Sequence, residues 1–135
     1  MPDLLDTLRQ DYAHFPHQQS YDIYDAEVFF KDPMTQFRGL KRYQEMIQFM
    51  TTWFKDPRLE LRDISQTGDR VETRWLLTWT TPLPWQPRIA ISGQTEMRLN
   101  AEGKVISHID TWDCSRWDVL KQHFPTASPS SPSSP

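Results

Sequence analysis

Hydrophobic side chains in the first half of the chain recur at the spacing of helices. Over residues 3–14 the apolar positions lie three or four residues apart, and Pro16 follows the end of the run. Residues 40–54 carry a longer stripe of leucine, methionine and aromatic side chains with the same period. This period predicts two amphipathic helices whose apolar faces pack on a core. A short second helix is predicted between them, over residues 20–26.

In the second half of the chain the hydrophobic period falls to two, which is typical of strands that bury one face. Four such stretches begin near residues 59, 71, 89 and 105, and a separate β-rich run over 28–30 ends at Asp32 and Pro33. Turn sequences at 66–69 and 100–103 predict antiparallel hairpins, and the proline-rich stretch 81–87 predicts a longer connection. Residues 115–124 predict a terminal helix with Ser115 and Asp118 as its capping box.

This order of elements predicts an α+β fold in which about three helices near the N-terminus pack on the concave face of a cone-shaped, strongly curved, mostly antiparallel sheet. A length of 135 residues without an internal repeat predicts one domain, over residues 1–125. Residues 126–135 contain mostly Ser and Pro and are predicted to form a disordered tail. Helices cannot fill a strongly curved sheet, so the mouth of the cone is a natural small-molecule site.

Composition and charge exclude several classes of function. The formal net charge is -3 and no run of Lys or Arg occurs, which argues against nucleic-acid binding. The acidic N-terminus has no long apolar stretch, so neither a signal peptide nor a membrane span is expected. The single cysteine, Cys114, cannot form an internal disulfide and is interpreted as a structural side chain. A cytoplasmic location is therefore predicted.

Two acidic segments supply the candidate chemistry. Asp32 follows the first strand, and His108 and Asp110 lie two residues apart on the last strand, so that all three converge if both strands share a sheet. Such a group can act as an acid/base pair or orient a water molecule. Two structural explanations stay open: Asp32 is a turn residue, and His108 with Asp110 is a buried pair that satisfies itself. Alternation divides the last strand into one face with Ile106, His108, Asp110 and Trp112 and another with Val105, Ser107, Ile109 and Thr111.

Four local signatures resemble the nuclear transport factor 2-like superfamily, also called SnoaL-like. They are YDAEVFFKDP at 24–33, FRGL at 37–40, MRLNAEGKVI at 97–106 and HIDTWD at 108–113. More narrowly, the chain is similar to an uncharacterised family of cyanobacteria and plants within that superfamily. The resemblance implies a shape rather than an activity, because the superfamily includes ketosteroid isomerases, scytalone dehydratases, polyketide cyclases, limonene epoxide hydrolases and members without catalysis.

The resemblance also implies roles for particular positions. Asp32 matches the general base of the isomerases, and the face of the last strand that carries His108 looks into the cone. The isomerases pair their base with a tyrosine and a protonated aspartate. Thr95 stands where that aspartate is expected, and Tyr12 is the nearest candidate for the tyrosine. Steroid isomerisation by the known route is therefore not expected.

Three functions remain open at this stage. The first is a binding domain for a small apolar molecule, lined by Tyr12, Trp75, Thr95 and Trp112, although large aromatic residues also serve as core. The second is a cofactor-free isomerase, dehydratase, cyclase or hydrolase with Asp32 as base and His108 as its partner. The third is a protein interaction module. No cofactor is expected, and no metal, because His108 and Asp110 supply only two ligands.

The outer face of the sheet predicts a partner for the chain. Alternation places Val105 and Ile109 on that face, which would leave apolar side chains exposed in a monomer. A two-fold homodimer through this face is the simplest arrangement that covers them.

Overall fold

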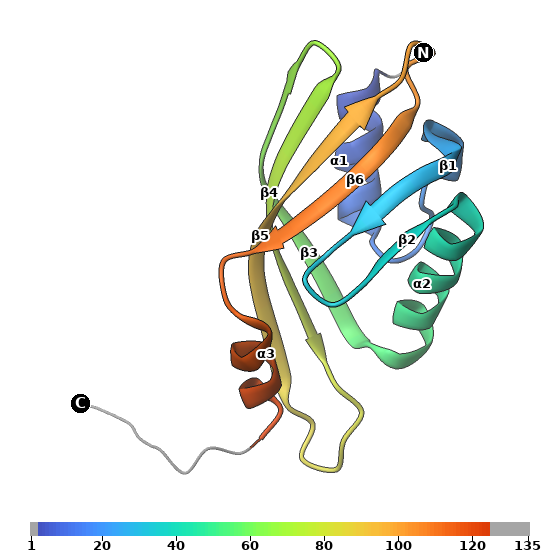
Figure 1. The fold of residues 1–135 in the computed structure, drawn as a ribbon. Coiled ribbons are helices and arrows are strands. Elements are labelled where there is room, and N and C mark those ends of the chain that lie inside the picture. The colour runs from blue at the N-terminus through green and yellow to red at the C-terminus, as the bar shows by residue number, and fades with distance from the viewer. Residues whose placement is uncertain (1–2, 125–135) are drawn as a thin grey trace.

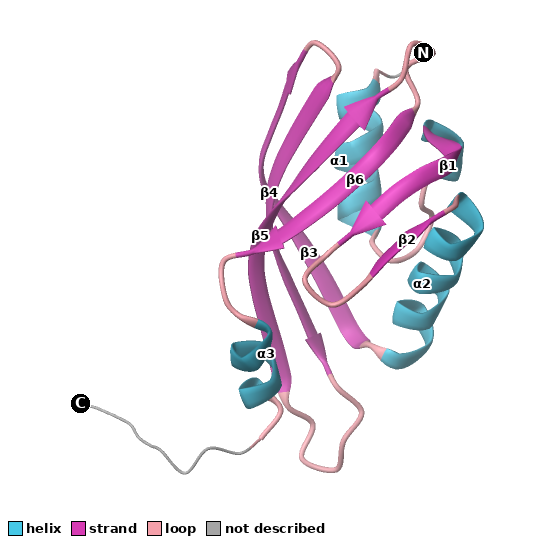
Figure 2. Cartoon of the chain, in the orientation of Figure 1, coloured by secondary structure: helices cyan, strands magenta, loops and turns pink. Residues whose placement is uncertain are grey.

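The computed structural model describes residues 3–124, which fold into three α-helices and one six-stranded sheet (Figure 1, Figure 2). Helices α1 (Leu4–His14) and α2 (Leu40–Trp53) precede the long strands, and α3 (Arg116–Gln122) follows them. The α+β class is therefore confirmed, with the third α-helix at the C-terminal end of the described chain. The predicted tail at 126–135 lies outside the described residues.

The helices begin where local capping predicts. The Asp3 side chain accepts a hydrogen bond from the Asp6 N–H at 2.8 Å, which satisfies one free donor at the start of α1. Ser115 and Asp118 form the predicted capping box, because each side chain accepts from the backbone N–H of the other at 3.0 Å. No helix within residues 3–124 is long and apolar enough to cross a membrane.

The predicted helix over residues 20–26 is wrong. Tyr21–Ile23 form a single 3-10 turn, and strand β1 (Tyr24–Lys31) begins where the helix was expected to continue. Tyr24, Val28 and Phe30 of β1 are buried in the core. Burial of one strand face outweighs the weak local helix preference of so short a segment.

The sheet has the strand order β2-β1-β6-β5-β4-β3. Its other strands are β2 (Gln36–Arg38), β3 (Lys55–Thr67), β4 (Arg70–Thr80), β5 (Arg88–Leu99) and β6 (Val105–Trp112). The pairing of β1 with β6 is parallel and the other four pairings are antiparallel, which confirms both predicted hairpins. The short strand β2 was not predicted from the sequence. Helix α1 packs against β3, α2 against β1 and α3 against β5.

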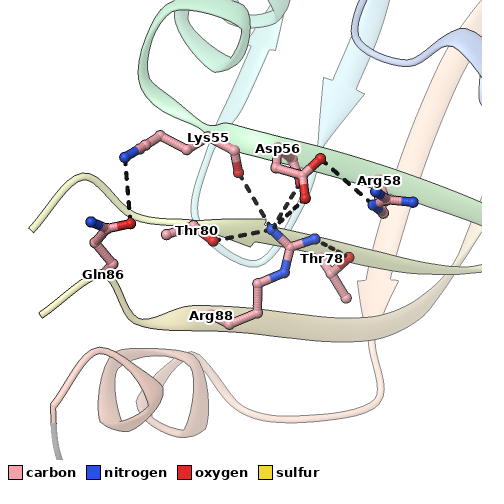
Figure 3. A network of polar contacts seen from close by, with 7 residues as sticks. All are labelled: Lys55, Asp56, Arg58, Thr78, Thr80, Gln86 and Arg88. Carbon is pink, nitrogen blue, oxygen red and sulfur yellow. Dashed lines mark hydrogen bonds and ion pairs between the residues drawn. The ribbon is translucent and has the colours of Figure 1, made fainter.

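A polar network holds the start of β3 to the end of β4 and the start of β5 (Figure 3). Arg88 Nη1 donates to the Asp56 carbonyl at 2.8 Å and to Thr80 Oγ1 at 3.1 Å, and Nη2 donates to Thr78 Oγ1 at 3.0 Å. The Asp56 backbone has a φ of 47°, which is uncommon for a residue with a side chain. One guanidinium therefore fixes an irregular end of the sheet beside its long connection.

A bulge in β6 corrects the predicted alternation at its start. Leu99 of β5 pairs with Val105, whereas the preceding Arg98 pairs with Ser107, so Ile106 is an extra residue in the ladder. Val105 is 0% exposed and belongs to the core, although it was expected on the outer face. Ile106 was expected on the inner face, and the bulge moves the alternation by one residue at this point.

The outer face of β4 and β5 is charged rather than apolar. Glu96 lies 3.6 Å from Arg70 and 3.8 Å from Arg98, and Arg74 lies 3.6 Å from Asp113. Exposed ion pairs of this kind contribute little to stability. The homodimer stays a prediction, but the apolar surface that motivated it is reduced because Val105 is in the core.

Candidate functional site

The sheet and the helices line a cavity of about 450 Å³. Small-molecule sites typically have volumes of roughly 300–1,000 Å³. Aliphatic, methionine and aromatic side chains from α1, α2 and the long strands form most of the wall. All seven candidate residues from the sequence line this one cavity: Tyr12, Asp32, Trp75, Thr95, His108, Asp110 and Trp112.

Asp110 is the centre of a hydrogen-bonded chain across β4, β5 and β6. Thr95 Oγ1 accepts from Trp75 Nε1 at 2.8 Å and donates to Asp110 Oδ1 at 2.6 Å. His108 Nε2 lies 3.0 Å from the same Oδ1. Because a carboxylate only accepts, Nε2 carries the hydrogen of this bond. Among residues 3–124, no hydrogen bond reaches Asp110 Oδ2, so half of the carboxylate is left for another partner.

Gly93 gives the Trp75 indole the space to reach Thr95. Gly93 pairs with Trp75 across β4 and β5. A Cβ atom at position 93 would lie 2.8 Å from Trp75 Cη2 and 2.5 Å from the Thr111 carbonyl oxygen, both too close for a real contact. Gly93 was not among the residues predicted to shape the site. An isolated glycine inside a strand pattern is the signal that marks such a close approach.

His108 is 7% exposed and lies among aromatic rings. Its ring centroid is 5.0 Å from that of Phe30, 5.7 Å from Tyr43 and 6.2 Å from Tyr24. The Nδ1 atom is buried and has no hydrogen-bond partner among the described residues. The prediction that His108 and Asp110 form a buried pair that satisfies itself is therefore only half correct. Nε2 is hydrogen-bonded to Asp110, but Nδ1 has no partner among the described residues. A buried polar atom without a partner costs stability and needs a functional or structural reason.

Asp32 lies in the turn between β1 and β2. Its Oδ1 accepts from the backbone N–H groups of Met34 and Thr35, each at 2.7 Å, so the predicted turn role is present. No hydrogen bond from residues 3–124 reaches Oδ2, and the side chain lines the cavity. Burial raises the pKa of Asp32 above its ordinary value, the two N–H donors oppose this, and the charge of Asp110 raises it further.

The register of the sheet explains why Asp32 and Asp110 affect each other. Phe30 of β1 lies opposite His108 of β6 in the parallel pairing. Because the pairing continues to Lys31 and Ile109, the next residues, Asp32 and Asp110, follow at the same level of the two segments. Asp32 is already in the turn, and both side chains line the cavity. Neighbouring strands are about 4.8 Å apart. The sheet therefore brings two carboxylates together from segments far apart in the sequence.

Tyr12 and Asp11 place two further polar groups at the cavity from α1. The Tyr12 hydroxyl is 2.8 Å from Thr73 Oγ1, and burial raises its pKa to about 12. Asp11 was missed, although it lies on the apolar stripe of the helix, three residues after Leu8. It is 6% exposed, accepts from Ser20 Oγ at 2.9 Å, and has a pKa raised by burial.

Helix α3 contributes a side of the cavity that sequence reasoning did not foresee. Gln122 exchanges two hydrogen bonds with the backbone of Ala90, at 2.7 and 3.0 Å. His123 Nε2 lies 2.8 Å from Thr81 Oγ1. These contacts hold the helix against β5, where Arg116 and Leu120 line the cavity. The helix itself was predicted, but its position depends on contacts that local periodicity does not encode.

Solved structures with this arrangement come from several kinds of protein. A nuclear transport factor 2-like protein of unknown function from Burkholderia pseudomallei is 14% identical, with a TM-score of 0.74 over 93% of this chain and 100% of that one. A putative SnoaL-like polyketide cyclase from a Jannaschia species is 14% identical, with 0.72 over 90% and 92%. An LEH-like epoxide hydrolase of M. tuberculosis is 12% identical, with 0.67 over 87% and 84%.

These similarities establish the fold alone, and the fold is the nuclear transport factor 2-like, or SnoaL-like, α+β cone that the sequence predicted. No curated protein matches the chain. A family model described as "Uncharacterized conserved protein (DUF2358)" matches residues 2–108, and the chain belongs to this family. Its distribution in cyanobacteria and plants stays a prediction.

Proposed function

We propose that this protein binds a small, largely apolar molecule in its cone cavity, with Asp32, His108 and Asp110 orienting the polar end of that molecule. The observation that carries the proposal is a cavity of about 450 Å³ whose wall is mostly aliphatic and aromatic. Protein interiors are close-packed, so packing alone does not favour a cavity of this size in a small domain. Apolar walls with a few convergent polar groups are typical of ligand sites.

The positions of the polar groups support the same proposal. Trp75 and Thr95 hold Asp110 in place through consecutive hydrogen bonds, so the carboxylate is oriented before any ligand arrives. Asp32 is held in the same way by its turn. Groups fixed in advance lose little conformational entropy on binding, which increases affinity and specificity.

The test is a titration with the uncharged apolar fluorophore N-phenyl-1-naphthylamine. We expect saturable binding to one site per chain, with increased fluorescence. Leu77 lines the cavity, whereas its neighbour Leu76 does not. Leu77→Phe should therefore weaken binding several-fold, and Leu76→Phe, which adds the same volume to the adjacent position, should not. Binding that is equally affected in both variants, or no saturable binding, would overturn the proposal.

Acid/base catalysis is the second candidate. It is favoured by Asp32, whose pKa is raised by burial and whose Oδ2 accepts no hydrogen bond from the described residues. A carboxylate with a raised pKa is a stronger base than an ordinary one. Solved structures of similar fold are described as a polyketide cyclase and an epoxide hydrolase. Conversion of an apolar epoxide or enone that is lost in Asp32→Asn would support catalysis. Binding without conversion of any such probe would support the first function alone.

Two further expectations accompany the proposal. We also propose that the protein forms a homodimer and lies in the cytoplasm, as predicted from the sequence. Neither is needed for ligand binding, because the cavity is lined by residues of one chain.

A further inference from the structure

The polar side chains of the cavity have a consistent chemical bias. Asp32 and Asp110 each use Oδ1 for internal hydrogen bonds, and no hydrogen bond from residues 3–124 reaches either Oδ2. His108 donates its Nε2–H to Asp110, so in the neutral ring Nδ1 is an acceptor, and it is buried without a partner. Apart from the exposed Arg116, the unpaired groups of fixed role among the described lining residues are therefore acceptors. The tyrosine and threonine hydroxyls can donate or accept and create no bias.

The charges of the lining have the same bias. Three carboxylates line the cavity, from Asp11, Asp32 and Asp110. Among the lining residues that the structure describes, Arg116 is the single Lys or Arg, and it is exposed at the first position of α3. Burial is the main cause that raises the pKa of Asp32, Tyr12 and Tyr43, and the negative charge of Asp110 adds to it in each case, so this charge acts on several walls of the cavity. A positive charge placed here would relieve that repulsion.

From this juxtaposition we infer that the ligand is an apolar amine, bound as its ammonium ion with the charged nitrogen within reach of Asp32 and Asp110. This inference rests on the proposed function and specifies the chemical class of its ligand. A primary ammonium supplies three N–H donors and a positive charge, which match unpaired acceptors and two level carboxylates. The apolar body of the amine then lies against the aromatic wall, where rings also attract cations.

A metal ion does not account for the same features. Among residues 3–124, no three His, Cys, Asp or Glu side chains are grouped closely enough to hold one. A hydrated ion would also leave the apolar part of the cavity without a partner. An amine with an apolar skeleton satisfies both parts of the wall with one molecule.

The experiment compares three probes that share a naphthylmethyl skeleton: the amine 1-naphthylmethylamine, the alcohol 1-naphthylmethanol and the carboxylate 1-naphthaleneacetate. Binding is measured by nitrogen-15 NMR titration of the intact chain near neutral pH, which also locates the site through the resonances that shift. We expect the amine to bind at least about tenfold more tightly than the alcohol, a difference of about 1.4 kcal/mol, and the acetate to bind most weakly. The shifts should centre on Thr95, His108 and Asp110.

Variants separate the charge from the cavity. Asp32→Asn keeps the Oδ1 acceptor of the turn, so it should fold, and it should weaken binding of the amine more than binding of the alcohol, because only the amine loses an ion pair. Asp110→Asn should act in the same direction. Asp63→Asn removes one negative charge from an exposed position outside the cavity and should have no effect.

Each outcome separates this inference from the proposed function. If the alcohol binds in the cavity as tightly as the amine, the inference is overturned and the proposed function stands. If none of the probes shifts cavity resonances, both are overturned. If the amine is preferred but Asp32→Asn and Asp110→Asn keep the full preference, the charged nitrogen lies elsewhere and the inference fails.

Discussion

Replacing Thr95 with valine tests whether the chain of hydrogen bonds behind Asp110 is a fixed part of the site. Thr95 is 3% exposed, and its hydroxyl joins Trp75 Nε1 at 2.8 Å to Asp110 Oδ1 at 2.6 Å. Valine keeps the shape of the side chain and removes the hydroxyl. Both hydrogen bonds are therefore lost without the creation of a cavity.

The magnitude follows from two losses. A buried donor left without an acceptor costs about 1–3 kcal/mol, which applies to the Trp75 indole N–H. A hydrogen bond to a charged group contributes about 1.5–3 kcal/mol, which applies to Asp110. The Asp110 side chain is 17% exposed and keeps its bond from His108, so water and the imidazole offset part of this loss. We expect Thr95→Val to reduce the free energy of unfolding by about 2–4 kcal/mol.

The assay is urea unfolding followed by circular dichroism, with NMR detection of the tryptophan indole N–H resonances. The Trp75 indole should lose protection from hydrogen exchange in Thr95→Val. Thr111→Val is the matched control, because Thr111 lies on β6, is exposed, and makes no side-chain hydrogen bond within residues 3–124. A Thr95→Val protein within about 0.5 kcal/mol of the wild type, with an unchanged indole resonance, would refute the reasoning.

Four further predictions concern stability and assembly. Burial raises the pKa of Asp11 and Asp32 in the folded protein above the ordinary value of 3.8. The protonated carboxyl groups therefore contribute their whole stabilisation below pH 3.8, and this stabilisation is lost as the pH rises through the pKa values of the folded protein. In urea titrations from about pH 3 to about pH 7, Asp11→Asn and Asp32→Asn should gain stability relative to the wild type as pH rises; a constant difference contradicts this. Gly93→Ala should cost about 1–3 kcal/mol by the same method, because its Cβ meets the Trp75 ring and a backbone carbonyl; an unchanged midpoint would mean that the strands separate freely. Arg88→Lys keeps the positive charge but loses the forked set of guanidinium donors, and it should lower the free energy of unfolding by about 1 kcal/mol. Backbone hydrogen exchange at the start of β3 should become faster, and unchanged exchange there would count against the network. Light scattering should give the mass of two chains if the homodimer forms, and a single-chain mass at all concentrations excludes it.

Local periodicity was enough to predict most of the secondary structure. The helices over 3–14 and 40–54 and the hairpin turns at 66–69 and 100–103 were placed correctly, because each is decided by neighbours in the sequence. His108 and Asp110 were paired for the same reason, since two residues apart on a strand share a face. What could be predicted was therefore what the chain specifies within about ten residues.

The structure differs from the prediction where contacts between residues far apart in the sequence determine the conformation. Tyr24 begins a strand rather than continuing a helix because β6 supplies its partner, and Val105 is turned inward by a bulge opposite Leu99. Asp11 is a polar residue on the apolar stripe of α1, and its burial depends on Ser20, nine residues away. The hydrogen bonds that position α3 join residues more than thirty apart, such as Gln122 and Ala90. None of these contacts leaves a periodic trace in the sequence.

The parallel pairing of β1 with β6 is the feature on which the site depends most. An antiparallel hairpin sets its register through its own turn, but β1 and β6 are neighbours in the sheet that the chain connects only through β2, α2, β3, β4 and β5. The match of Phe30 with His108 is therefore fixed by the packing of both side chains in the core. A slip of one residue would turn Asp110 to the outer face while Asp32 kept its turn, and the two carboxylates would separate. Because the same register buries His108 and levels the two carboxylates, the stability of the core and the charge of the cavity are set by one pairing.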